Sequence, residues 1–145
     1  WKDISSDEGK INSNYGWCIY SEENGNQYKH VLRELKANPN SRRAAMIYNR
    51  PSMHLDFNRD GMSDFMCTFA NTFMIRDGKL ISHYAMRSND AVFGYNNDVA
   101  WAKFVQGQLA YDLEVEVGEL IWTATNLHVY ERHFEFIEAL INAGK

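Results

Sequence analysis

Apolar residues recur at helical spacing in three stretches of the chain, and each stretch predicts a helix. The first runs from Gln27 to Lys36. The second opens on an N-cap at Asn96 or Asn97 and continues to about Leu113. The third runs from Glu131 to about Ala143, and its apolar residues are expected mostly in the core: Phe134, Ile137, Ala139, Leu140 and Ile141.

Other stretches carry the patterns of β-strands. Short strands are expected over residues 44–49 and 117–127. The central pattern is a hairpin with strands over 64–76 and 79–87, in which Asp77-Gly78 supplies the two positive-φ residues of a type I′ turn. Strands mixed with two or three helices predict an α+β fold. With period-2 alternation, one face of the first hairpin strand would carry Cys67, Phe69, Asn71, Phe73 and Ile75.

Composition and charge narrow the classes of function. The 145 residues are 45% hydrophobic and 14% aromatic, which is enough for a single domain with a substantial core. The net charge of −4 argues against duplex nucleic acid or a membrane surface as partner, because either requires a basic face. The two cysteines lack CxxC or zinc spacing, so no metal is expected, and without a signal peptide the cytoplasm is the default location.

Three features have candidate chemistry and also a structural explanation. Cys67 lies among apolar residues and one amide, as ligand-binding groups often do, although a lone cysteine is more commonly a small buried hydrophobe. The adjacent Arg42 and Arg43 are typical of a solvated corner, but they are also what a phosphate monoester needs. Asp98 would lie in the first turn of its helix, where the helix dipole favours a carboxylate.

The order of these features resembles the thymidylate synthase family, and the resemblance covers nearly the whole chain. It implies a single domain over residues 1–145 with a mixed sheet and packed helices. The family's N-terminal segment and C-terminal tail have no counterpart here, so these residues are expected to be a core. The matching pieces are Arg42-Arg43, the strand cysteine Cys67, the turn from Arg87 through Ser88 to Asp90, the loop with Gly94, and His128 with Tyr130.

The resemblance implies a role for each of these side chains. Cys67 would be the nucleophile that adds to C6 of a pyrimidine nucleotide, and Arg87 would favour its thiolate form. Asp90 and Gly94 would belong to the site of the folate co-substrate. The nucleotide's phosphate and sugar would be held by Ser88, by His128 and Tyr130, and by Arg42 and Arg43 reaching across a homodimer interface.

Asp98 departs from the family in an informative way. It stands where thymidylate synthases place the asparagine that reads the base, and a carboxylate can accept a hydrogen bond from the amino group of cytosine. A carboxyl that holds a proton near N3 would also stabilise the C6 adduct. The departure is similar to the family's typically phage-encoded branch, which uses 5,10-methylenetetrahydrofolate to hydroxymethylate dCMP and captures the intermediate with water rather than hydride.

Several alternatives remain open from the sequence. The chain could be a thymidylate synthase, or a hydroxymethylase of dUMP or CMP, with an unusual base reader. It could also be a non-catalytic core that only dimerises. Thr68 follows the cysteine where synthases commonly have histidine, which weakens the transfer of detail from the family.

Overall fold

The central hairpin forms at the turn that its sequence predicts. In the computed structural model, which describes residues 2–144, β2 (Thr68–Arg76) pairs antiparallel with β3 (Lys79–Met86). Asp77 and Gly78 have φ angles of 49° and 72°, the two left-handed conformations that a type I′ turn requires. The first strand begins at Thr68 rather than at Asp64, so Cys67 lies just before it.

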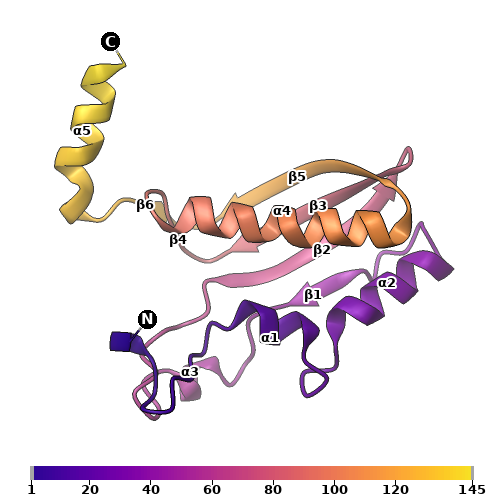
Figure 1. Ribbon diagram of the computed structural model, residues 1–145, viewed down its shortest axis with the longest axis horizontal. Coiled ribbons are helices and arrows are strands. Elements are labelled where there is room, and N and C mark those ends of the chain that lie inside the picture. The colour runs from indigo at the N-terminus through magenta and orange to yellow at the C-terminus, as the bar shows by residue number, and fades with distance from the viewer. Residues whose placement is uncertain (1, 145) are drawn as a thin grey trace.

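Four strands form the main sheet in the order β1-β2-β3-β5 (Figure 1). The edge strand β1 (Ala45–Ile47) is antiparallel to β2, whereas β5 (Glu116–Ala124) runs parallel to β3. A parallel pair needs a crossover, and α4 (Gly94–Leu113) lies within that connection. A second, two-stranded parallel sheet joins β4 (Asn89–Asp90) to β6 (Leu127–His128). The mixed sheet with its helices confirms the predicted α+β class.

The core lies between the main sheet and the helices α1 (Tyr15–Tyr20), α2 (Gln27–Ala37) and α4. On the sheet side, the buried ring of Tyr84 stacks on Trp122 of β5 with centroids 4.8 Å apart. From α4, the indole N–H of Trp101 donates to the hydroxyl of Tyr48 at 3.0 Å. Within residues 2–144 no helix is both long and apolar enough to span a bilayer. The remaining short elements are η1 (Lys2–Ile4), α3 (Met53–Asp56) and η2 (Glu131–His133).

The predicted start of the long helix was wrong. Helix α4 begins at Gly94 with Phe93 at the N-cap, and neither Asn96 nor Asn97 caps it. The side chain of Asn97 instead donates to the carbonyl of Phe93 at 3.0 Å, a bond within the first turns of the helix. Asp98 therefore lies beyond the first turn, where the helix dipole no longer accounts for a carboxylate.

The predicted shared face of the first hairpin strand is also interrupted. The register between β2 and β3 shifts between Thr68 and Ala70, as at a β-bulge. Phe69 is consequently 44% exposed, while Thr68 and Asn71 are fully buried. The extra residue breaks the period of two, so Phe69 does not share the buried face with Asn71 and Phe73.

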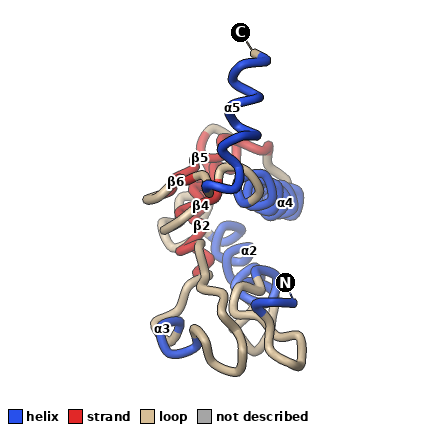
Figure 2. Tube along the Cα trace, turned by 90° about the vertical axis from the view of Figure 1, so that its left-hand side faces the viewer, coloured by secondary structure: helices blue, strands red, loops and turns tan. Residues whose placement is uncertain are grey.

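The C-terminal helix α5 (Phe134–Ala143) forms as predicted, but its apolar side is not in the core. The helix projects away from the sheet in two perpendicular views (Figures 1 and 2), and none of its residues is buried. Phe134, Leu140 and Ile141 are each at least half exposed, at 50%, 55% and 57%. Periodicity identifies the apolar side of a helix, but it does not show what lies against that side.

Candidate active site

A cavity of about 510 Å³ gathers most of the predicted site residues. Its walls come from six parts of the chain: η1, the start of α1, the segment before β2, β4 with the residue before it, the first turns of α4, and the end of β6 with the residues after it. Residues separated by more than 60 positions thus meet at one place. The predicted residues that line it are Cys67, Ser88, Asp90, Gly94, Asp98, His128 and Tyr130.

Cys67 lies at the cavity wall with Arg87 beside it. The guanidinium of Arg87 donates from Nη2 to Sγ of Cys67 at 3.5 Å and to the carbonyl of Phe65 at 2.8 Å. It also donates from Nε to the carbonyl of Met66 at 3.0 Å, and it lies over the ring of Phe65. These contacts fix the cation next to the sulfur, so the arginine is positioned before any ligand arrives.

Opposing effects act on the proton of Cys67, with burial and the carboxylates of Asp98 and Asp64 on one side and Arg87 on the other. Burial raises the pKa of the Cys67 thiol, and the Arg87 guanidinium opposes this rise without cancelling it. The thiol itself donates to the carbonyl of Phe65, at 3.6 Å. The protein at rest therefore holds a thiol, with a cation in place to stabilise the thiolate once the proton leaves.

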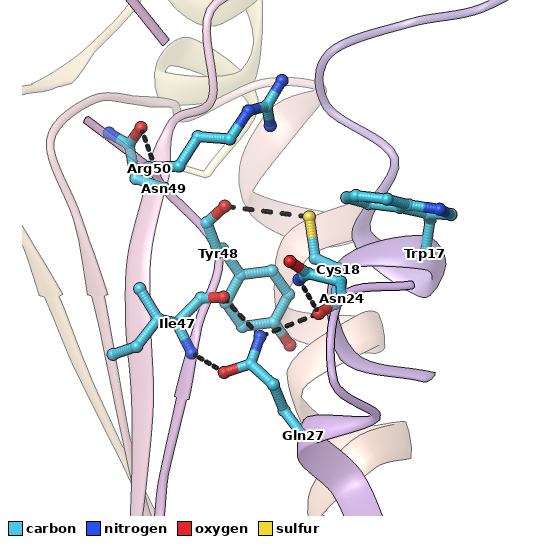
Figure 3. A pocket seen from close by; sticks show the side chains of 8 residues that line it. All are labelled: Trp17, Cys18, Asn24, Gln27, Ile47, Tyr48, Asn49 and Arg50. Atoms are coloured by element: carbon cyan, nitrogen blue, oxygen red, sulfur yellow. Dashed lines mark hydrogen bonds between the residues drawn. The ribbon is translucent and has the colours of Figure 1, made fainter. Parts of the chain in front are cut away.

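The second cysteine, Cys18, lies in a different environment (Figure 3). It is 1% exposed, and its thiol donates to the carbonyl of Tyr48 at 3.7 Å. Burial also raises the pKa of the Cys18 thiol, and no arginine hydrogen-bonds its sulfur among the contacts of residues 2–144. Nearby, the amide of Gln27 bonds both backbone groups of Ile47 and so covers the outer edge of β1. Cys18 is a core residue in this arrangement.

Asp98 projects from α4 into the cavity that Cys67 also lines. Burial raises the pKa of Asp98 to about 6, and a hydrogen bond from Asn89 works against the rise. That bond runs from Nδ2 of Asn89 to Oδ2 of Asp98 at 2.8 Å. A carboxyl with such a pKa is half-protonated at about pH 6 and keeps roughly a tenth of its protons at pH 7, so it can both donate and accept protons in this range.

Hydroxyl groups behind Cys67 form a contact that the sequence did not indicate. The hydroxyl of Thr68 lies 2.9 Å from that of Tyr15 and 3.1 Å from that of Tyr84. Tyr15 also lines the cavity, and burial raises the pKa of its phenol, as it does for Tyr84. Asn89 occupies the variable position of the Arg-Ser-x-Asp turn and Tyr15 opens α1, and neither position signals a chemical role for its side chain.

His128 and Tyr130 lie together at the cavity, with their rings edge to face and 4.9 Å apart. Asp90 accepts from the backbone N–H of Val92 with Oδ1, and within residues 2–144 no hydrogen bond is made by its Oδ2. A free carboxylate oxygen at an apolar cavity wall suits the N–H groups of a pterin, so these residues fit a folate. No cluster of three or more His, Cys, Asp or Glu able to hold a metal occurs in that described range.

Arg42 and Arg43 are not brought to this cavity. They lie in a separate hollow with Asn38, Asn40 and Ser41, and Nη2 of Arg43 pairs with Glu34 at 2.8 Å. Within one chain they therefore do not face Cys67. Their predicted role across a dimer interface stays a prediction.

Comparison with known proteins shows the family. Residues 1–144 match the family model described as thymidylate synthase. The chain belongs to the thymidylate synthase family. This membership confirms the resemblance inferred from the Arg-Arg, Cys67 and Arg-Ser-x-Asp pattern.

Relatives within the thymidylate synthase family differ in their similarity to this chain. The deoxycytidylate 5-hydroxymethyltransferases of Enterobacteria phages T2 and T4 are 49% and 50% identical to it over 152 aligned residues. Those alignments cover 100% of this chain and 62% of each relative, so the chain spans less than two thirds of their length. The thymidylate synthase of Bacillus licheniformis is 30% identical over 142 residues, covering 93% of this chain and 49% of the relative.

Proposed function

We propose that this protein is a deoxycytidylate 5-hydroxymethyltransferase, which transfers a one-carbon unit from 5,10-methylenetetrahydrofolate to C5 of dCMP. The observation that carries the proposal is the position of Asp98. A carboxyl with a raised pKa lines the same cavity as the candidate nucleophile Cys67, at the place where synthases have the base-reading asparagine. The greater identity to relatives of that name, about 50% against 30% for a synthase, supports the same reading.

The chemistry of the chain begins at Cys67. Its thiolate, stabilised by Arg87, adds to C6 of the pyrimidine, and the electron pair of the C5–C6 double bond moves toward C5 and N3. A proton held by Asp98 at N3 neutralises this developing charge, which makes C5 nucleophilic at low cost. The folate supplies the electrophilic carbon. After loss of the C5 proton and tetrahydrofolate, water adds to the exocyclic methylene and the Cys67–C6 bond breaks.

The other cavity residues bind and orient the nucleotide and the folate. Ser88 contacts the phosphate, and His128 with Tyr130 holds the sugar hydroxyl. Asp90 and the close approach allowed by Gly94 form the folate side of the cavity. Arg42 and Arg43 complete the phosphate site of the partner in a homodimer.

The homodimer is part of the proposal, and the uncovered face of the main sheet supports it. The helices cover only one face. On the other face Ile47 and Ile121 are 50% and 44% exposed, and Met74 and Ile81 are half-buried beside them. Apolar side chains on a central sheet are usually covered, and a second copy of this chain would cover them.

A thymidylate synthase is the second candidate, because synthases share the family and about 30% identity. Calorimetric titration of dCMP and of dUMP into the complete natural protein separates the two. We expect preferential binding of dCMP, and the preference should swing toward dUMP in Asp98→Asn, because the amide restores one donor and one acceptor. A wild-type protein that prefers dUMP would refute the deoxycytidylate hydroxymethyltransferase and leave an enzyme that acts on dUMP, a synthase or a dUMP hydroxymethylase.

A further inference from the structure

Asn89 is a buried residue whose backbone is fixed by the strand that carries His128. Its N–H donates to the carbonyl of Asn126 at 2.8 Å, and it pairs with Leu127 in the ladder between β4 and β6. The side chain is 2% exposed, although it borders the cavity that contains Cys67. The backbone that carries this amide is therefore held in place, and the amide has almost no contact with solvent.

The side-chain amide of Asn89 is turned so that its nitrogen bonds Asp98, while its oxygen is left unpaired among the described residues. Nδ2 donates to Oδ2 of Asp98 at 2.8 Å, whereas the buried Oδ1 of Asn89 has no hydrogen-bond partner among the described residues. An unpaired buried acceptor is unfavourable and calls for an explanation. Rotating the amide by half a turn would set an oxygen against the carboxylate, so the bond to Asp98 dictates the present orientation.

Gly94 leaves just enough room for this pair. A Cβ at Gly94 would lie 3.4 Å from Nδ2 of Asn89 and 3.6 Å from Oδ2 of Asp98, and only 3.2 Å from Cβ of Asp90. The first turn of α4 thus closes over the hydrogen bond between Asn89 and Asp98. The amide and the carboxyl are held against each other by packing as well as by the bond itself.

We propose that Asn89 is a positioning residue that keeps Oδ2 of Asp98 a hydrogen-bond acceptor and confines the carboxyl proton to Oδ1. This inference rests on the proposed function, since its consequence is selection of a 4-amino over a 4-oxo pyrimidine. A carboxyl oxygen that already accepts from an amide N–H is the poorer place for a proton. The acid then presents one fixed acceptor and one fixed donor, instead of two interchangeable oxygens.

A fixed acceptor and donor distinguish the two bases. On cytosine the 4-position donates and N3 accepts, which pairs with Oδ2 as acceptor and a protonated Oδ1 as donor. On uracil the 4-oxo group accepts and N3 donates. A uracil held in the same orientation would therefore place an acceptor against Oδ2 and a donor against the protonated Oδ1. An Asp98 free to exchange its proton between oxygens would serve either base. Asn89 removes that freedom.

Other titratable groups face Asp98, and they bear on any measurement of its proton. They are common to the wild type and to a variant at position 89, so a difference between the two isolates the amide. These groups are Tyr15 from α1, Asp64 and Cys67 before β2, Tyr84 from β3, Asp90 from β4, His128 from β6, and Tyr130.

The first experiment needs neither a nucleotide nor a variant. In the complete natural protein labelled with ¹³C and ¹⁵N, the carboxyl carbon of Asp98 and the side-chain amide of Asn89 are followed by NMR from pH 4 to pH 8. We expect the amide resonance to move with the same midpoint as the Asp98 carboxyl. An amide resonance that ignores the Asp98 titration overturns the inference, whatever the protein binds.

The second experiment compares Asn89→Ala with Asn71→Ala in calorimetric titrations of dCMP and dUMP. Asn71 is a matched control, because it is also a buried asparagine with an unpaired amide nitrogen, but it bonds Ser82 in the sheet and does not line the cavity. Asn89→Ala should reduce the dCMP preference roughly tenfold and should raise the pKa of Asp98, while Asn71→Ala changes neither. An unchanged preference and an unchanged pKa in Asn89→Ala overturn the inference. Failure of the wild type to bind dCMP refutes the proposed function instead, and the NMR titration still decides the role of Asn89.

Discussion

The two cysteines are both poorly exposed, and they differ in that only Cys67 has an arginine, Arg87, hydrogen-bonded to its sulfur among the described residues. Its guanidinium hydrogen-bonds Sγ of Cys67, whereas Cys18 donates to a backbone carbonyl in the core. We expect Cys67→Ala to reduce release of tritium from C5 of labelled dCMP by roughly a thousandfold or more. Cys18→Ala is the matched control, and it should retain release while losing about 1 kcal/mol of stability. Release that persists in Cys67→Ala would remove this residue from the mechanism.

The raised pKa of Asp98 makes a prediction about stability. Because the folded protein holds the Asp98 proton up to about pH 6 and the unfolded chain releases it near pH 4, ionisation of this group weakens the fold as pH rises through that interval. Asp98→Asn cannot ionise. The unfolding free energy of Asp98→Asn, measured relative to that of the wild type, should therefore be about 1 kcal/mol higher at pH 7.5 than at pH 4, after allowance for solvent screening.

Urea unfolding of wild type and Asp98→Asn at the two pH values measures this difference. All other titrating groups are present in both proteins and largely cancel in the comparison. A difference in unfolding free energy that stays constant with pH would mean that the carboxyl ionises as freely in the folded protein as in the unfolded chain.

The sequence predicted residues that motifs mark and missed those that only contacts reveal. Cys67, Asp90 and His128 resemble the family's pattern and Asp98 departs from it at a marked position, and the structure gathers all of them at one cavity. The pattern gives no role to Asn89, at its variable position, or to Tyr15, because what these residues do depends on a hydrogen bond to Asp98 and on a hydroxyl contact with Thr68. Distances across the fold decide those contacts, and spacing along the chain does not encode them.

At the scale of elements, two glycines respond in opposite ways to an added methyl group. A Cβ at Gly118 of β5 would lie 3.0 Å from the carbonyl oxygen of Leu80 on the neighbouring strand, so the backbone must move. At Gly107 in α4 a Cβ meets nothing within 4 Å, and alanine is the better helix former. We expect Gly118→Ala to lower the free energy of unfolding by about 1–3 kcal/mol. Gly107→Ala should raise it by about 0.5–1 kcal/mol.

Chemical denaturation of both alanine variants tests this pair. Equal effects at the two positions would show that the close approach between β3 and β5 is relaxed in solution.

The type of most elements could be predicted, but their irregularities could not. The Asp77-Gly78 turn and helix α2 followed from local residues. The bulge near Phe69 depends on pairing with β3, and the start of α4 at Gly94 depends on the loop that precedes it. For α5, the apolar pattern predicted the helix correctly but wrongly placed its apolar side in the core, because periodicity carries no information about what covers a face.

At the scale of the whole molecule, the uncovered face of the sheet predicts the state of assembly. A charge at Ile121, 44% exposed on that face, would be buried without a partner in a homodimer. Ile121→Asp in the complete natural protein should therefore shift the dimer toward monomer by at least tenfold in dissociation constant, or about 1.4 kcal/mol.

Analytical ultracentrifugation measures the shift, with Leu55→Asp as control. Leu55 is 71% exposed on α3, away from the sheet, so its variant should sediment as the wild type does. A wild-type monomer at micromolar concentration would refute the homodimer and the proposed role of Arg42 and Arg43 across it.

The parallel pairing of β3 with β5 determines the order in which the cavity can assemble. Cys67 and Arg87 are brought together by a local hairpin, whose closure requires a loop of few residues and is fast. His128 arrives only when the chain through α4 has folded back and β5 has docked, a step of much greater sequence separation, whereas Asp98 bonds the nearby Asn89. We therefore expect His128 to join the cavity after Cys67 and Arg87 during folding, and the Cys67 thiol to stay exposed to oxidation until the crossover closes.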